Sequence, residues 1–104
     1  MLDAADQVAQ FVSGRQRADL DSNQMLLFAV VRAIEVFGEA ASKVSEDARA
    51  GAPAIPWTAI VGMRNRIIHA YWDVNKDILW KAAVEEVPAL VPALRTLAPH
   101  AVGT

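Results

Sequence analysis

The chain has 104 residues, of which 54% are hydrophobic and 21% charged, with 10 Lys and Arg against 12 Asp and Glu and no cysteine. This length corresponds to a single domain over residues 1–104. The missing cysteine excludes a disulfide framework, a thiolate metal site and a cysteine nucleophile. The hydrophobic fraction exceeds the roughly 45–50% of an average soluble domain, so we expect a self-association surface besides the core.

The charge balance and the N-terminus restrict the classes of partner. A net charge of −2 argues against nucleic-acid binding across the whole surface, so any such contact is expected to be local. Asp3 and Asp6 stand where a signal peptide would have basic residues, and the longest uncharged stretch, 51–63, is interrupted by prolines. These features predict a cytoplasmic protein without a membrane partner.

The N-terminal third predicts a helix, a polar linker and the start of a second helix. Leu2, Ala5, Ala9 and Val12 recur at helical spacing, and Gly14 closes that segment. Residues 13–21 are polar and are predicted to form a linker. Asp21 or Ser22 is expected to cap the next helix, with Gln24 completing a capping box if the cap is Asp21.

The second helix, predicted over residues 25–44, is apolar almost all round between Met25 and Phe37. A helix of this kind lies inside a bundle or between two protomers. Its polar residues Arg32, Glu35 and Glu39 follow one stripe at spacings of three and four. The stripe is either a narrow solvated face or the wall of a polar cleft.

The C-terminal half predicts two further helical elements after a turn-rich loop at residues 50–56. One helix is expected from Trp57 to about Trp72, and Asp73 or Asn75 is expected to cap the next. Pro88 is expected to kink or restart this last element, and Pro92 to act in the same way. Since no alternating run is long enough for a strand, the predicted class is all-α, an up-and-down bundle of four to five helices.

Candidate chemistry concentrates in residues 62–72. On a helical wheel Arg64 falls within the apolar face, near Tyr71, whereas Asn65, Arg66 and His69 point to the opposite side. An arginine head is rarely buried alone, so Arg64 is expected to pair with Glu39 or Glu35 or to face a cleft. Arg64 and His69 are five residues apart, roughly 140° on an ideal helix, and would converge only through a bend or a second copy of the segment.

Histidine and arginine together suit metal-independent RNA cleavage. An imidazole with a pKa near neutrality deprotonates the 2′-OH or protonates the leaving 5′-oxygen, and a guanidinium stabilises charge on the phosphorus. An Arg and a His at this spacing also occur by chance, and a structural histidine is then the ordinary interpretation.

The segment Arg64-Asn65-Arg66-Ile67-Ile68-His69-Ala70-Tyr71 resembles the R-x4-H-x-Y signature of HepT-type toxins in the HEPN superfamily. Three flanking segments agree with the family pattern at family-like separations: Gly38-Glu39-Ala40-Ala41, Pro56-Trp57-Thr58-Ala59-Ile60 and Val87-Pro88-Ala89-Leu90. The resemblance covers nearly the whole chain. One departure is the N-terminus, which precedes the first matching helix by fewer residues than is usual in the family.

The resemblance implies a homodimeric HEPN-like bundle in which two signatures face one cleft and cleave RNA without a metal or cofactor. It assigns catalysis to Arg64 and His69, an orienting role to Asn65, and adenylylation to Tyr71; Glu39 and Arg66 are candidate supporting residues. The implied partner is an antitoxin, a minimal nucleotidyltransferase of the MntA type, in a type II/VII-like toxin–antitoxin system, with a higher hetero-oligomer as one form of the complex.

Two other interpretations remain open from the sequence. The chain is alternatively a non-catalytic accessory subunit that binds nucleotide or substrate for a nucleotidyltransferase. A purely structural dimeric bundle is the third interpretation, and it leaves the unusual placement of Arg64 unexplained.

Overall fold

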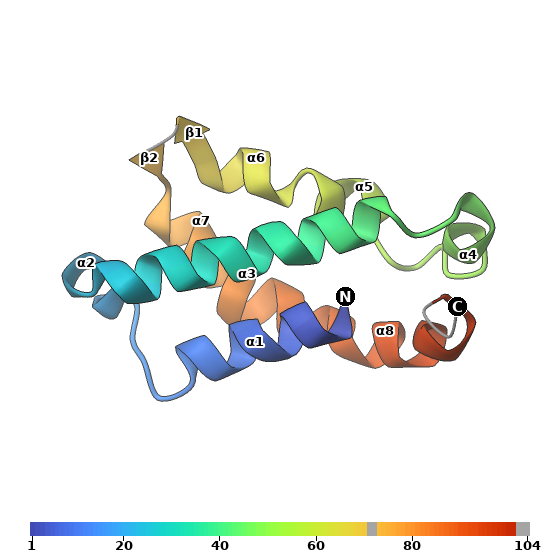
Figure 1. The fold of residues 1–104 in the computed structure, drawn as a ribbon, viewed down its shortest axis with the longest axis horizontal. Helices are drawn as coiled ribbons and strands as arrows, with labels where there is room; N and C mark the ends of the chain where they lie inside the picture. Colours follow the sequence, from blue (N-terminus) through green and yellow to red (C-terminus); the bar gives the residue numbers. More distant parts are fainter. Residues whose placement is uncertain (71–72, 102–104) are drawn as a thin grey trace.

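The computed structural model describes the backbone of residues 1–70 and 73–101 and the side chains of residues 1–68 and 73–97. Helices α1 (Leu2–Val12), α2 (Asp19–Ser22), α3 (Gln24–Ser42), α4 (Glu46–Ala50), α5 (Trp57–Val61) and α6 (Met63–Ile67) come first. A hairpin of β1 (Ile68–Ala70) and β2 (Asp73–Val74) follows, and then α7 (Lys76–Lys81), the π-helical η1 (Ala82–Glu86) and α8 (Val87–Ala101). The predicted predominance of helix is confirmed, although the chain is more segmented than a simple bundle of four to five helices (Figure 1).

The long helix α3 is the centre of the molecule. It packs against α1 on one side and against α5 and α6 on another, and the short η1 meets both α1 and α8 (Figure 1). The completely buried side chains that fill the space between these helices are Val8, Leu20, Val30, Ile34, Phe37, Ile60, Ile67, Leu79 and Val87. No helix among the described residues is long and apolar enough to cross a membrane.

The start of α3 corrects the predicted cap. Asn23 caps this helix, since its side-chain oxygen accepts a hydrogen bond from the backbone N–H of Leu26 at 3.0 Å. Asp21 and Ser22 instead belong to the short helix α2, so no capping box forms around Asp21. The physical reason is Leu20, whose side chain is buried in the core and which therefore folds the end of the polar linker into a helical turn.

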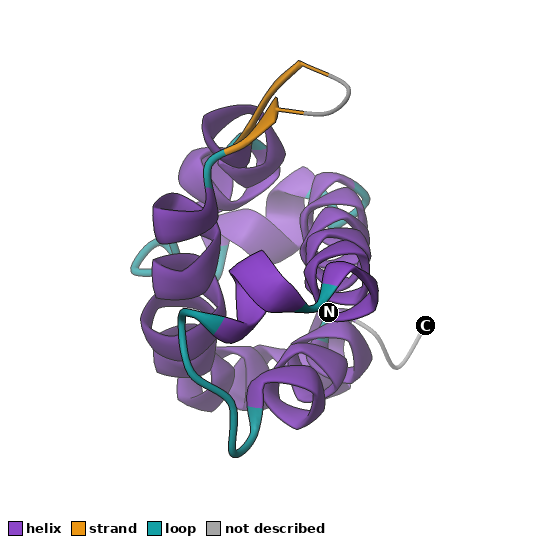
Figure 2. Cartoon of the chain, turned by 90° about the vertical axis from the view of Figure 1, so that its left-hand side faces the viewer, coloured by secondary structure: helices purple, strands orange, loops and turns teal. Residues whose placement is uncertain are grey.

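The helix predicted from Trp57 to Trp72 is interrupted at Gly62 and ends at Ile67, so this prediction was wrong in its second half. After it the backbone becomes extended, with Ile68 at φ −110° and ψ 110°. Ile68 pairs with Val74 across the hairpin, and the N–H of Asn75 donates to the carbonyl of Ile67 at 2.7 Å. β-Branched residues favour this extended backbone, and the hairpin projects from the end of α6 (Figure 2).

The helix α7 begins at one of the two predicted capping residues, Asn75. The side chain of Asn75 accepts a hydrogen bond from the N–H of Ile78 at 3.1 Å, which confirms this residue as the N-cap of α7. The irregularity expected at Pro88 takes the form of the π-helical turn η1, which ends at Glu86, two residues before the proline. A proline lacks the N–H that would close the preceding turn, and a π turn accommodates that loss. Pro92 lies within α8, which continues past it.

Candidate active site

Arg64 on α6 and Glu35 on α3 form an ion pair between two elements. The Nε of Arg64 lies 3.3 Å from an Oε of Glu35, and the two side chains are 51% and 27% exposed. Although Arg64 falls within the apolar face of the helical wheel, its side chain is not buried. It reaches across to α3 with about half of its surface exposed. Of the two carboxylates expected as partners, Glu35 is the one that pairs.

This ion pair borders an open hollow of about 220 Å³ between α3, α5 and α6. The residues that line the hollow are Glu35, Gly38, Glu39, Ser42, Val61 and Arg64. Gly38 brings the helices close together, since a Cβ at this position would lie 3.2 Å from the carbonyl oxygen of Ile60. Glu35 and Glu39 of the polar stripe thus line a cleft, and Arg32 is exposed one turn away.

The three supporting candidates have different surroundings. Glu39 lines the hollow but lies 3.9 Å from Lys43, and it makes no ion pair with Arg64. Asn65 is exposed. Arg66 approaches Glu86 of η1 at 3.8 Å, so its side chain turns away from the hollow that Arg64 borders. The structure therefore brings Arg64, Glu35 and Glu39 together and leaves Arg66 outside.

His69 belongs to strand β1, and its side chain lies outside the described part of the chain. Tyr71 lies outside the described residues altogether. The backbone still changes one expectation, because α6 ends at Ile67 and the angular separation of an ideal helix does not apply beyond that residue. The backbone therefore bends between Arg64 and His69, and a bend was one of the two ways in which these residues were expected to converge.

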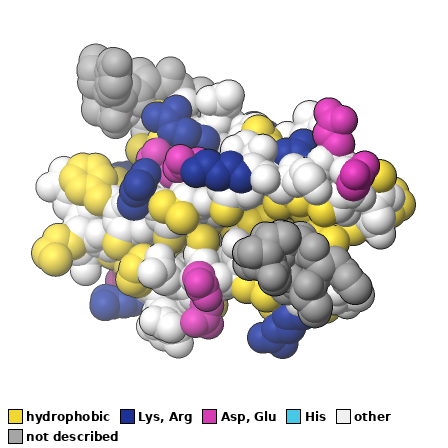
Figure 3. Space-filling model, turned by 45° about the vertical axis from the view of Figure 1, so that its right-hand side comes forward, with side chains coloured by type: hydrophobic (Ala, Val, Ile, Leu, Met, Phe, Trp, Pro, Cys, Tyr) yellow, Lys and Arg dark blue, Asp and Glu magenta, His cyan; other side chains and the backbone are white. Residues whose placement is uncertain are grey.

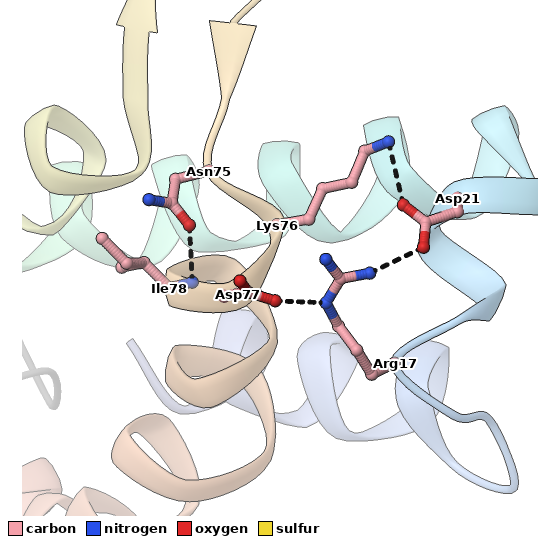
Figure 4. Close-up of polar contacts among 6 residues, drawn as sticks. All are labelled: Arg17, Asp21, Asn75, Lys76, Asp77 and Ile78. Atoms are coloured by element: carbon pink, nitrogen blue, oxygen red, sulfur yellow. Dashed lines mark hydrogen bonds and ion pairs between the residues drawn. The ribbon is translucent and has the colours of Figure 1, made fainter.

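A network of four charged residues anchors the element that follows the hairpin (Figure 4). Nε of Arg17 donates to Asp77 at 2.7 Å, its Nη1 donates to Asp21 at 2.9 Å, and Nζ of Lys76 donates to Asp21 at 3.1 Å. The hydrogen bond from Lys76, aided by that from Arg17, lowers the pKa of Asp21 below its ordinary value. Asp77, together with Asp21, raises the pKa of Arg17.

Sequence reasoning missed this network, since Lys76 and Asp77 lie 55 and 60 positions from their partners Asp21 and Arg17. Its place in the fold relates it to the candidate site. Lys76 and Asp77 form the first turn of α7, directly after β2 and the capping residue Asn75. The network therefore ties one end of the hairpin that contains His69 to α2 and the linker before it.

The arrangement around Arg64 can bind an anion. A half-exposed guanidinium beside a hollow has N–H groups free for a second acceptor while Glu35 fixes its stem. Within residues 1–68 and 73–97, no three histidine or acidic side chains converge as the ligands of a metal ion do.

The chain is thus a mostly helical domain with an arginine at an interhelical cleft and a histidine five positions later. The chain belongs to the HepT-like ribonuclease family, whose model matches residues 1–97. That family is a family of ribonucleases, so the resemblance noted from the signature is confirmed.

The relatives it resembles are also named as ribonucleases. "Putative RNase MJ1380" of Methanocaldococcus jannaschii is 36% identical over 90 residues, which are 86% of this chain and 83% of that protein. "Putative RNase TTE0752" of Caldanaerobacter subterraneus is 35% identical over 76% of this chain and 70% of its own length. "Probable ribonuclease HepT" of Thermococcus cleftensis is 43% identical over 63 residues, 61% of this chain and 57% of that protein. No solved structure matches the chain.

Proposed function

We propose that this chain is a metal-independent endoribonuclease and the toxin component of a toxin–antitoxin system. Membership of the HepT-like ribonuclease family supports the activity. The observation that carries the site is Arg64, held by Glu35 at the edge of an open hollow and five residues before His69. A purely structural bundle would not need an arginine held beside an open hollow, so this arrangement favours a functional site.

In the proposed reaction His69 and Arg64 act on one phosphodiester. The 2′-oxygen attacks phosphorus as the imidazole accepts its proton, and the bond from phosphorus to the 5′-oxygen breaks as that oxygen gains a proton. The products are a 2′,3′-cyclic phosphate and a 5′-hydroxyl. Arg64 donates hydrogen bonds to the phosphoryl oxygens, whose charge grows in the pentacoordinate transition state. Asn65 orients the reacting groups and Glu39 supports the charge balance, whereas Arg66, which approaches Glu86, takes no direct part.

The proposed active form is a homodimer whose two signatures face a common cleft. A second copy would supply a second His69 and Arg64, so that one imidazole acts as base and the other as acid. The hydrophobic content above the average of soluble domains supports such an association.

The proposed control is covalent. An antitoxin of the minimal nucleotidyltransferase type transfers AMP from ATP to the hydroxyl of Tyr71 and releases pyrophosphate. The product carries a negative phosphodiester and a bulky nucleoside two residues from His69. The charge would repel RNA and the nucleoside would block its access. Binding of the antitoxin to the dimer would create the hetero-oligomer expected from the resemblance.

Cleavage of RNA by the purified chain tests the proposed activity. We expect cleavage that persists in EDTA and leaves 2′,3′-cyclic phosphate ends. His69→Ala and Arg64→Ala should each abolish it, and the toxicity of the chain, while the circular dichroism spectrum stays helical. Binding of nucleotide or RNA without any cleavage would favour the accessory-subunit interpretation, and full toxicity in both variants would contradict the catalytic assignment.

Intact-mass spectrometry after co-expression with a minimal nucleotidyltransferase of the MntA type tests the proposed control. We expect mass additions in whole AMP units that disappear in Tyr71→Phe. Inhibition without any added mass would show that the antitoxin acts by binding alone.

A further inference from the structure

The outer face of α3 continues beyond the candidate site as a stripe of exposed apolar side chains. Met25, Phe28, Arg32 and Glu35 follow one another along this face at spacings of three, four and three residues. Met25 is 84% exposed and Phe28 is 59% exposed, although both are large hydrophobic residues. In Figure 3 hydrophobic side chains gather at the end of the molecule formed by α2 and the first turns of α3, with Lys or Arg side chains nearby.

A second hollow adjoins this stripe at the junction of α1 and α3. It measures about 370 Å³ and is lined in part by Phe11, Arg15 and Met25. Phe11 is itself 36% exposed. None of the residues that line this hollow is acidic, so an anion placed there meets no opposing carboxylate in its wall.

The two arginines that flank the aromatic side chains are not neutralised. Among the described residues Arg15 and Arg32 make no ion pair, whereas Arg17, Arg64 and Arg66 each pair with a carboxylate. Exposed aromatic rings next to unpaired guanidinium groups are typical of surfaces that bind single-stranded nucleic acid, where bases stack on the rings and phosphates contact the cations.

We propose that this surface, defined by Phe11, Arg15, Met25, Phe28 and Arg32 and here named the α3 track, binds the single-stranded RNA that flanks the cleaved bond. This inference rests on the proposed ribonuclease function. Phe28 stacks on a base, and Arg32 contacts a phosphate between that base and the hollow at Arg64. Seven residues of helix separate Phe28 from Glu35, about 10.5 Å along the axis, which is the length of about three stacked nucleotides.

The charges on α3 favour RNA over a second protein chain. If two copies paired through this same face, each would have to present carboxylates of the face to Arg15 and Arg32 of the other. The two acidic residues of the same stripe are already engaged, Glu35 with Arg64 at 3.3 Å and Glu39 with Lys43 at 3.9 Å. The phosphates of RNA supply the missing charge without disturbing either pair.

Binding of a fluorescein-labelled 2′-O-methyl 12-mer tests the inference, because an RNA without a free 2′-OH binds but cannot be cleaved by the proposed chemistry. Removing a base-stacking ring in Phe28→Ala should raise the Kd measured by fluorescence anisotropy by about 5- to 100-fold. Phe28→Trp should retain wild-type affinity, because the larger ring still stacks. Arg32→Ala should weaken binding and lower the slope of log Kd against log salt by about one.

Lys81→Ala is the matched control for Arg32→Ala, since Lys81 is exposed on α7 and makes no ion pair among the described residues. It should leave both the Kd and the salt slope unchanged. Wild-type affinity in Phe28→Ala and Arg32→Ala would overturn the inference. It would also be overturned if sedimentation showed that Phe28→Ala dissociates an oligomer, which would make this face a contact between copies.

Failure of the inference and failure of the proposed function give different results. Tight binding of the 12-mer that depends on Phe28, without cleavage of ordinary RNA, would contradict only the nuclease. Cleavage that is indifferent to Phe28 and Arg32 would contradict only the α3 track.

Discussion

At the scale of single residues, the ion pair between Arg64 and Glu35 does more for orientation than for stability. Both side chains retain contact with solvent, at 51% and 27% exposure. Exposed and half-exposed ion pairs contribute less than about 1 kcal/mol to folding. The same contact fixes the direction of the guanidinium, and a misplaced catalytic group lowers a reaction rate steeply.

Glu35→Gln should therefore separate activity from stability. The amide keeps the shape of the side chain but loses the charge that holds Arg64, so we expect cleavage to fall by about 10-fold or more while the free energy of unfolding changes by less than about 1 kcal/mol. Steady-state cleavage of an RNA oligonucleotide and urea denaturation of the same preparation measure the two quantities.

Glu85→Gln provides the control for this substitution, because Glu85 is an exposed residue of η1 and makes no ion pair among the described residues. It should leave both quantities unchanged. An unaltered cleavage rate in Glu35→Gln would show that the guanidinium does not need its carboxylate partner.

Part of the candidate site could be predicted from the sequence, and the identity of the partner of Arg64 could not. An arginine within an apolar helical face already indicates a carboxylate partner or a cleft, and the structure shows both at Arg64. The choice between Glu35 and Glu39 depends on how α3 is placed against α5 and α6, which approach it closely at Gly38 and pair Arg64 with Glu35. Helical periodicity does not encode that distance, so both residues remained candidates.

At the scale of elements, the end of α6 determines where the histidine of the signature lies. Periodicity predicted one helix to about Trp72, but periodicity takes no account of hydrogen bonds between segments that compete with the helix. The carbonyl of Ile67 accepts a hydrogen bond from Asn75, which is eight residues away, and Ile68 pairs with Val74. Pairing between segments is a tertiary effect that a wheel cannot represent.

Asn75 closes the hairpin and caps the next helix, so Asn75→Ala should affect both stability and activity. Loss of its side-chain bond to Ile78 should cost about 1 kcal/mol. A frayed first turn of α7 would also loosen the strand before it, and the cleavage rate should fall by more than the folded fraction does. Asn75→Asp should restore both, since aspartate caps a helix equally well.

Asn23→Ala is the matched comparison, because the Asn23 side chain caps α3 with the same kind of hydrogen bond, to the N–H three residues on, but does not adjoin the hairpin. It should show a similar loss of stability in chemical denaturation and little loss of cleavage per folded molecule. Equal effects of the two alanine variants on cleavage would show that the hairpin needs no anchoring by Asn75.

At the scale of the whole molecule, segments far apart in sequence are joined by charge as well as by the core. The family resemblance and the apolar periodicity were sufficient to predict a mostly helical chain and the position of α3. They could not predict that Arg17 and Asp21 meet the first turn of α7, because single surface charges have no periodic pattern. The network is nevertheless positioned to hold α2 against the base of the hairpin.

The lowered pKa of Asp21 makes this connection sensitive to acid. A carboxylate with a folded-state pKa below the ordinary value of 3.8 contributes stability that is complete above that value and is lost as the pH falls through the folded-state pKa. The raised pKa of Arg17 acts in the opposite sense, and its contribution is lost only in strong alkali. Between these limits both groups are charged and the network is intact.

Asp21→Asn should therefore lower the melting temperature at pH 7 and reduce its dependence on pH in the acidic range. The wild-type and variant melting temperatures should converge as the pH falls through and below 3.8, because protonation then removes from the wild-type protein the charge that the substitution removes at every pH. Added salt at pH 7 should narrow the difference, since these side chains are exposed and their attraction is screened. The substitution Asp6→Asn is the control, because Asp6 is an exposed carboxylate of α1 without an ion pair among the described residues, and it should show none of these differences.

A constant difference in melting temperature between the wild-type and Asp21→Asn proteins from pH 7 to pH 2.5 would contradict this prediction. It would mean that Asp21 stabilises the fold through its shape and hydrogen bonds, and that its charge contributes nothing.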